Sequence, residues 1–295
     1  FTGNATGVTL GGTSNRVLGN QFTGWREAAI EIPAGQGGEI AYNELSRPDA
    51  WLPATTPNQV RMGMRLRHSS KADSVHVNGR IYRNYFHHFP TKPIPSQYSS
   101  GQSDAVTVCE SVVPAFANGT RQIGWEVDYN LIENHLGGHG VVDIKCGGAK
   151  VRFNTLVNSS GGRIDIRIGR DTELSGNWIE NAGGMLIHGG YHRIFGNRLV
   201  NTAAGLALEA GDVEWDYCQT CLPGSTRTAT RRVYNVHLAG NIAPVVVGKT
   251  YSGVNYTLPA YGTRVEKNTG KVTIGLAVGT TVSASTDVAV PVALR

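Results

Sequence analysis

The chain has 295 residues and a formal net charge of +5, with 27 Lys and Arg against 22 Asp and Glu and a pI of about 9.1. Its 38 glycines and the absence of helical periodicity argue against a helical protein, and no apolar run approaches the roughly 18 residues that a membrane-spanning helix needs. The basic residues are scattered along the chain, so we expect no nucleic-acid partner and no membrane partner. An acidic polysaccharide fits the positive charge better.

The chain begins at Phe1 rather than Met and shows no signal-peptide pattern. We therefore expect either a processed protein or a piece cut from a longer chain. We expect the protein to be secreted or periplasmic. No linker or change of composition divides the sequence, which predicts one domain over residues 1–295.

An asparagine with an apolar residue two positions later recurs along the chain. It occurs at Asn20, Asn43, Asn84, Asn130, Asn154, Asn177, Asn197 and Asn241. From Asn130 to Asn197 the steps are 24, 23 and 20 residues, and the next step of 44 residues is close to two periods. A repeat of about 22 residues, made of short β runs and Gly turns, indicates a solenoid. We predict an all-β fold, a right-handed parallel β-helix, in which the asparagines stack as an internal ladder at a turn.

Three stretches interrupt this repeat. Residues 46–75 and 87–103 are rich in Pro, Ser, His and Thr, and residues 212–232 carry three arginines and a pair of cysteines. We expect all three to be long loops that leave the solenoid and border a binding surface. The Val-, Thr- and Gly-rich tail after about residue 243 is expected to supply the last coils and a cap.

The four cysteines predict no metal site. Cys218 and Cys221 form a lone CxxC motif, which is more typical of a disulfide across a short loop, or of free thiols, than of zinc. Cys109 and Cys146 end similar β runs on what the repeat places as neighbouring coils. We expect these two side chains to stack inside the helix.

Aligning the coils on their asparagines predicts a column of polar residues on one outward face. The members of this column, spaced by 22, 21 and 21 residues, are Lys145, Arg167, His188 and Glu209. Two aspartates, Asp143 and Asp165, lie two positions earlier on the same face. Neighbouring strands lie about 4.8 Å apart, so these side chains are expected to form one patch within reach of one or two sugar rings. The alternative is a solvated face with ordinary charge pairs.

A second pattern lies in the segments between residues 104 and 200. They are Asp104-Ala105-Val106-Thr107-Val108, Tyr129-Asn130-Leu131-Ile132-Glu133-Asn134, Asp143-Ile144-Lys145-Cys146, Ile166-Arg167-Ile168-Gly169, and residues 154–162, 176–179, 183–187 and 192–197. In these segments, about a third of the chain, the sequence resembles polysaccharide lyase family 6, the β-helical alginate and chondroitin lyases. The resemblance implies β-elimination on a uronate, with Lys145 as the Brønsted base. It also implies that Arg167 stabilises the leaving side or donates a proton, and that Ca²⁺ held by carboxylates neutralises the uronate.

Two departures from the family pattern bear on that metal. Gly138-His139-Gly140 stands where an acidic pair is expected, and Ile168 stands where a His is common. Only three aspartates remain nearby as the oxygen ligands that Ca²⁺ requires. We therefore expect no metal or other cofactor, with Ca²⁺ as the alternative, and we expect neutralisation of the substrate by Arg163, Arg167, Arg170, His139 or His188. The candidate substrate-binding residues are Asp104, His139, Asp143, Arg163, Asp165, Arg170, His188, His192 and Glu209, although His192 is more typical of a turn histidine with satisfied hydrogen bonds.

Three other functions stay open at this point. A polygalacturonase-like hydrolase would use Asp143 and Asp165 as paired carboxylates. A C5-epimerase would abstract the same proton as a lyase. A non-catalytic β-helix could bind a glycan without turning it over.

Overall fold

The computed structural model describes most of the chain, and everything below concerns those residues. The described residues are 2, 6–34, 36–48, 62–66, 77–90, 103–109, 124–136, 140–167, 169–211, 232–250, 258–285 and 288–289. The predicted site residue His139 and the CxxC pair lie outside them.

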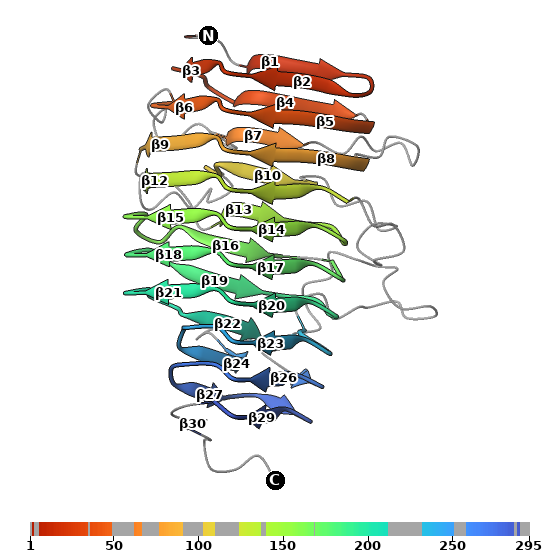
Figure 1. Ribbon diagram of the computed structural model, residues 1–295, viewed down its shortest axis with the longest axis vertical. Coiled ribbons are helices and arrows are strands. Elements are labelled where there is room, and N and C mark those ends of the chain that lie inside the picture. Colours follow the sequence, from red (N-terminus) through yellow and green to blue (C-terminus); the bar gives the residue numbers. More distant parts are fainter. Residues whose placement is uncertain are drawn as a thin grey trace.

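Short strands wind into coils that stack along one axis, and every pair of neighbouring strands in the three long sheets is parallel (Figure 1). Sheet 1 has eleven strands in the order β1 (Thr6–Gly11), β4 (Ala28–Ala34), β7 (Met62–Leu66), β10 (Val106–Val108), β13 (Gly140–Ile144), β16 (Arg163–Ile166), β19 (Gly184–Ile187), β22 (Leu206–Glu209), β24 (Val245–Lys249), β27 (Val272–Ile274) and β30 (Val288–Ala289). Sheet 2 consists of β2 (Asn15–Leu18), β5 (Gln36–Ala41), β8 (Val77–Tyr82), β11 (Glu126–Asp128), β14 (Lys150–Arg152), β17 (Glu173–Ser175), β20 (Arg193–Phe195), β23 (His237–Ala239), β26 (Arg264–Glu266) and β29 (Thr281–Ser283). Sheet 3 consists of β3 (Gln21–Thr23), β6 (Glu44–Ser46), β9 (Tyr85–Phe89), β12 (Leu131–His135), β15 (Thr155–Val157), β18 (Trp178–Glu180) and β21 (Arg198–Val200). A separate pair joins β25 (Ala260–Tyr261) to β28 (Ala277–Val278).

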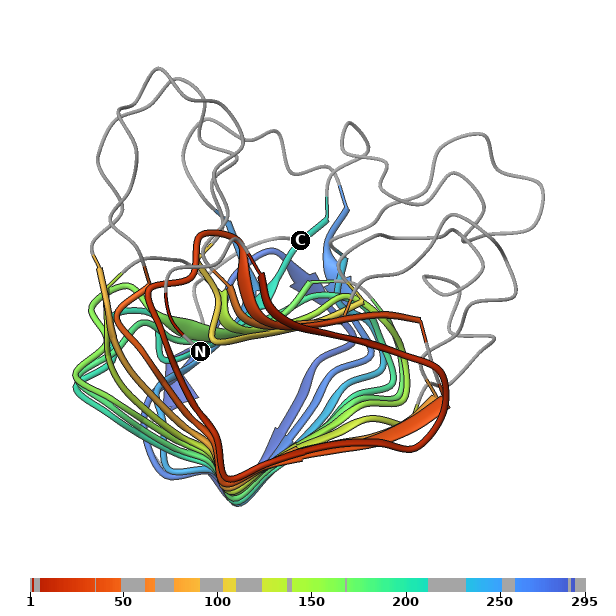
Figure 2. The same ribbon diagram turned by 90° about the horizontal axis from the view of Figure 1, so that it is seen from above.

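The predicted right-handed parallel β-helix is confirmed. Figure 2 looks along its axis and shows the three sheets as the three sides of a prism. The described ranges contain no helix that could span a membrane.

The asparagine ladder is the internal spine that the repeat predicts. The side-chain oxygen of Asn177 accepts from the backbone N–H and the side-chain amide of Asn154, each at 3.0 Å. The Asn177 amide in turn donates to Val151 O at 2.9 Å and to the side-chain oxygen of Asn197 at 2.8 Å. The same bonds repeat between the other members of the ladder, which are Asn20, Asn43, Asn84, Asn130, Asn241 and Asn268. Each coil thus supplies hydrogen-bond partners to the buried asparagine amides of the next coil. Without such partners, burying these polar groups would destabilise the fold.

One expectation about this spacing is wrong. Asn197 donates directly to Asn241 at 2.9 Å, so the 44-residue step is one coil with an insertion and not two periods. The insertion falls at residues 212–231, outside the described ranges. The position of each ladder asparagine is set by its contact with the asparagine of the adjacent coil. The number of residues between two such asparagines can therefore vary.

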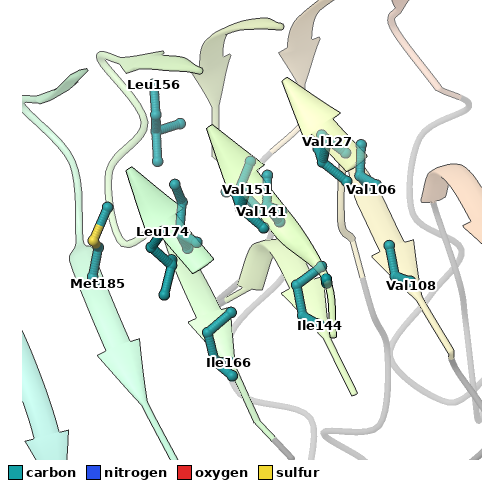
Figure 3. Packing of buried hydrophobic residues seen from close by; sticks show 14 of the residues in the cluster. Val106, Val108, Val127, Val141, Ile144, Val151, Leu156, Ile166, Leu174 and Met185 are labelled. Carbon is teal, nitrogen blue, oxygen red and sulfur yellow. The ribbon is translucent and has the colours of Figure 1, made fainter. Parts of the chain in front are cut away.

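Stacked aliphatic side chains fill the interior. Val106, Ile144, Ile166 and Met185 come from successive strands of sheet 1 and belong, with Val151 from sheet 2, to one buried cluster (Figure 3). Each such side chain contributes roughly 1.5–3 kcal/mol when fully buried. Cys109 and Cys146, predicted to stack inside, form a disulfide with a Cα–Cα distance of 6.0 Å.

The loop predicted over residues 46–75 is partly a strand. All of β7 is buried, and it pairs with β4 on one side and β10 on the other. Its sequence, Met62-Gly63-Met64-Arg65-Leu66, places Met64 and Leu66 in the core as an ordinary coil does. The Pro- and Ser-rich residues around it concealed this short run. The predicted excursion over 87–103 likewise begins inside β9.

Candidate active site

Sheet 1 places the predicted column in register. Ile144 pairs with Ile166, and Ile166 pairs with Ile187. The residue after each of these isoleucines therefore stands in one line, and this line is Lys145, Arg167 and His188. Glu209 continues the line, because Leu208 pairs with Ile187. The alignment made from asparagine spacing is thus confirmed, and we call these four residues the site column.

Asp143 links the first two members of the site column. Its Oδ2 lies 3.2 Å from Lys145 Nζ and 3.5 Å from Arg167 Nη1. The carboxylate is buried, and its other oxygen, Oδ1, has no hydrogen-bond partner among the described residues. Seven per cent of the Lys145 side chain is exposed against 40% for Arg167. Arg167 is therefore the member of the pair that an incoming anion meets first.

Asp165 lies beside Asp143 in register and belongs to a second ion pair. Its Oδ1 accepts from Arg163 Nε at 2.6 Å. Burial raises the pKa of Asp165, Arg163 opposes the shift, and the negative charge of Asp143 adds to it. Arg163 is thus held by Asp165 at the edge of the same face.

Asp104 is a third buried aspartate, close enough to Asp143, Lys145 and Arg167 to interact with their charges. Thr107 Oγ1 donates to its Oδ2 at 2.6 Å, and Thr107 is paired in register with Asp143. Burial, with the charge of Asp143 added, raises the pKa of Asp104 to about 7. At neutral pH, both the protonated and the ionised form of such a carboxyl group are populated.

His188 and Glu209 form the far end of the site column, and both are buried. Nε2 of His188 contacts the Glu209 carboxylate, and Nδ1 lies 3.2 Å from the backbone oxygen of Arg167. Both ring nitrogens thus face oxygen acceptors, an arrangement satisfied in full when both carry a proton.

His192, one of the candidate substrate contacts, binds backbone groups of a turn in the structure. It is completely buried, its Nδ1 accepts from the backbone N–H of Thr172 at 3.1 Å, and its Nε2 donates to His188 O at 2.9 Å. Burial lowers the pKa of His192 to about 4, so the ring is neutral and holds the turn. Arg170, another candidate, lies after β16 with its guanidinium 4.6 Å from the centre of the Tyr191 ring.

Arg65 is a charged neighbour that the sequence interpretation missed. It pairs in register with Thr107, two strands before Asp143, and its Nη1 lies 3.8 Å from Glu31 Oε2. The strand that carries it was predicted as loop, so no column could be drawn through it. The alternation of large apolar residues with Gly63 and Arg65 in Met62–Leu66 was the available indication.

The acidic residues do not fit a Ca²⁺ site. Calcium requires six to eight oxygen ligands, whereas Asp143 Oδ2 already serves two cations and Asp165 is paired with Arg163. Within the described ranges, no three His, Cys, Asp or Glu side chains are arranged to hold a metal ion.

Fold and site together define a right-handed parallel β-helix protein with a charged ladder on its longest sheet. No protein-family model matches the sequence, and neither does any curated protein. Among solved structures, the chain is similar to a PL6 alginate lyase in complex with a trisaccharide, with 13% identity, a TM-score of 0.48, and coverage of 96% of this chain and 79% of that chain. It is also similar to a mannuronic acid specific family 6 polysaccharide lyase from human gut microbiota, with 13% identity, a TM-score of 0.41, and coverage of 97% and 76%. A third is the PL6 family polysaccharide lyase of Pseudopedobacter saltans, with 10% identity, a TM-score of 0.45, and coverage of 96% and 92%.

These solved structures carry the name of the family that the sequence resembles. At such identities and TM-scores the likeness by itself assigns neither an activity nor a substrate.

Proposed function

We propose that this protein is a polysaccharide lyase that cleaves a uronate-containing acidic polysaccharide by β-elimination. The observation that carries the proposal is the stacking of Lys145 and Arg167 on adjacent coils, joined through one oxygen of Asp143. The uronate substrate, the reaction and the roles of the residues are all part of the proposal.

Elimination requires that the proton on C5 of the uronate become acidic. The neighbouring carboxylate must be neutralised so that negative charge can develop on it as the proton leaves. Arg167, exposed on the outer face, is placed to bind that carboxylate. His188 is its neighbour on the next coil, and Arg163 lies at the start of the strand that Arg167 follows. No step requires a metal ion in this scheme.

Lys145 would act as the base in its neutral form. Its Nζ takes the C5 proton, the electron pair forms the C4–C5 double bond, and the C4–O4 bond breaks with its electrons going to O4. The leaving oxygen then takes a proton from water or from the lysine that has just gained one. The Asp143 carboxylate raises the pKa of Arg167, which favours charge stabilisation over proton donation as the role of this arginine.

The geometry gives less support to the hydrolase alternative. Asp143 and Asp165 are neighbours, as a carboxylate pair would need to be, but both are buried and both hold cations of the same face. A glycoside hydrolase needs one carboxyl to protonate the leaving oxygen and the other to meet water or the sugar. A glycan-binding module without turnover remains the other alternative.

The test is to incubate the protein with alginate, pectate, chondroitin, glucuronan and hyaluronan and follow the ultraviolet absorbance of the unsaturated product. We expect a rise with at least one polyuronate, lost in Lys145→Ala and kept in Lys150→Ala. Lys150 is a matched control because it is a lysine on sheet 2, with its Nζ 2.8 Å from Glu126 Oε1. The rise should persist in chelator.

New reducing ends without this absorbance would move the assignment to hydrolysis. An absorbance rise that survives in Lys145→Ala would contradict the proposed base. Binding of a polyuronate without either product would favour the non-catalytic binding module. Loss of activity in chelator would favour a calcium-dependent mechanism.

A further inference from the structure

A strip of exposed side chains lies at the turn between sheets 2 and 3, immediately before the asparagine ladder. Four successive coils place Tyr42, Arg83, Tyr129 and Phe153 there, and we call these residues the corner strip. The exposed fractions of the three aromatic residues are 53%, 48% and 46%. Arg83 is also exposed.

The members of the corner strip make contact in two pairs. Arg83 Nη1 donates to the Tyr42 hydroxyl at 3.0 Å, and its guanidinium lies 5.8 Å from the centre of that ring. The rings of Tyr129 and Phe153 are stacked, with centroids 5.0 Å apart and an angle of 20° between their planes. The two pairs occupy four successive coils, and adjacent coils lie about 4.8 Å apart.

The backbone makes these residues a poor choice for the fold alone. All four are in the left-handed region, with φ between 50° and 60°. Other coils place glycine at the same turn position, as at Gly176 and Gly196, and glycine adopts this conformation without the steric cost that a bulky residue incurs. Large aromatic side chains at strained, exposed positions indicate a surface that acts on something outside the chain.

The corner strip lies away from the candidate active site. The turn that carries it is the sharp corner at the bottom of Figure 2, whereas sheet 1 forms the opposite side of the prism. A chain bound at this corner would leave the outward face of sheet 1 free. The corner strip is thus a separate surface.

Its charge indicates the kind of ligand. Among the described residues, no carboxylate lies within ion-pair distance of Arg83, and Asp128, next to Tyr129 in the chain, is buried and paired with Arg80 and Arg152. Aromatic surfaces take the apolar faces of sugar rings, and an unpaired arginine takes a carboxylate. The net charge of +5 adds a general attraction for polyanions.

We propose that the corner strip is a second, non-catalytic binding surface for an acidic polysaccharide chain, which runs along the helix axis. It shares its class of ligand with the proposed function but not its residues. Failure of one proposal therefore leaves the other open to test.

The test measures retardation by alginate in native affinity electrophoresis. Lys145→Ala is the background, so that the probe stays intact. Tyr129→Gly/Phe153→Gly removes half of the corner strip and introduces the residue that other coils already have there, so the fold should be kept, as circular dichroism would verify. We expect roughly tenfold weaker retardation for this variant and no retardation by a neutral glucan.

Trp178→Ala is the matched control. Trp178 is an exposed aromatic residue on sheet 3 with Arg198 over its ring at 4.8 Å, outside the corner strip. It should leave the retardation unchanged. Unchanged retardation in the folded glycine variant, or an equal loss in Trp178→Ala, would overturn the proposal. A change of molecular mass in sedimentation, with retardation unaltered, would also overturn it and assign the strip to self-association.

Discussion

Lys145 and Arg167 stand one residue past the ends of β13 and β16 and share a single oxygen of Asp143, at 3.2 and 3.5 Å. Arg167 is the more exposed of the two cations, whereas the carboxylate that they share is buried, so a positive charge faces the solvent at this position. A uronate carboxylate would pair with Arg167 there. The charge arrangement, more than any single residue, accounts for the proposed preference for acidic polysaccharides.

Removing the shared charge should impair activity beyond its effect on stability. In Asp143→Asn the lysine and the arginine repel each other and lose their common position. We expect activity to fall roughly 100-fold, as for a displaced catalytic group, and the free energy of unfolding to fall by roughly 1–3 kcal/mol. Both are measured with the lyase assay and with urea unfolding.

Asp128→Asn is the control for that variant. Asp128 is also a buried carboxylate that holds two arginines, but it lies on sheet 2. It should lose a similar amount of stability and keep its activity per folded molecule. Equal activities of the two variants would contradict a special role for Asp143.

Asp104 should make stability fall between about pH 4 and pH 7. The pKa of this carboxyl is about 7 in the folded protein and about 4 in an unfolded chain. The folded state therefore holds the proton more tightly, and the resulting stability is complete below pH 4 and lost as the pH rises through 7. The effect amounts to at most a few kcal/mol.

Urea unfolding at a series of pH values checks this, because Asp104→Asn should lack that part of the slope. Identical slopes in the variant and the parent protein would contradict it. The measurement requires no substrate and is independent of the proposed function.

The two neighbouring histidines should respond differently to substitution. His188→Ala removes a group of the site column and should lower activity roughly tenfold or more, as loss of a charge-stabilising donor does. His192→Ala leaves Thr172 N–H and His188 C=O without their partner, and should cost roughly 1–3 kcal/mol of unfolding free energy.

The pH dependence of stability separates the two residues further. The pKa of His192 is lowered to about 4 by burial, so its contribution is present above about pH 6.5 and lost as the pH falls towards 4. His192→Ala should lack this loss. A His192→Ala protein that folds normally but is inactive would argue that the ring reaches the substrate after all.

The asparagine ladder should stabilise the protein far more than a second, exposed one. Asn177→Ala leaves several buried donors and acceptors unsatisfied and should cost roughly 2–4 kcal/mol. Asn181 is a matched control because it also bonds to asparagines on both sides, Asn158 and Asn201, but at an exposed turn. Asn181→Ala should cost well under half as much, and thermal unfolding of both variants tests the comparison.

Several features of this protein follow from the sequence alone. The recurring asparagine predicts the β-helix, and its spacing places Lys145, Arg167, His188 and Glu209 in one line. This works because a parallel ladder repeats the same local contacts in each coil, so a position in the repeat is also a position in space. Cys109 and Cys146 could be placed together on the same grounds.

Other features were decided only by the tertiary structure. The step from Asn197 to Asn241 proved to be one coil, and Arg65 proved to lie on a strand of sheet 1. Distances between coils decide which cations pair with Asp143. They also decide that His192 is buried inside a turn. The local sequence pattern specifies the repeat. The length of an insertion between two coils, however, has almost no effect on the contacts that the following coil makes. Only the folded chain therefore shows where each coil ends.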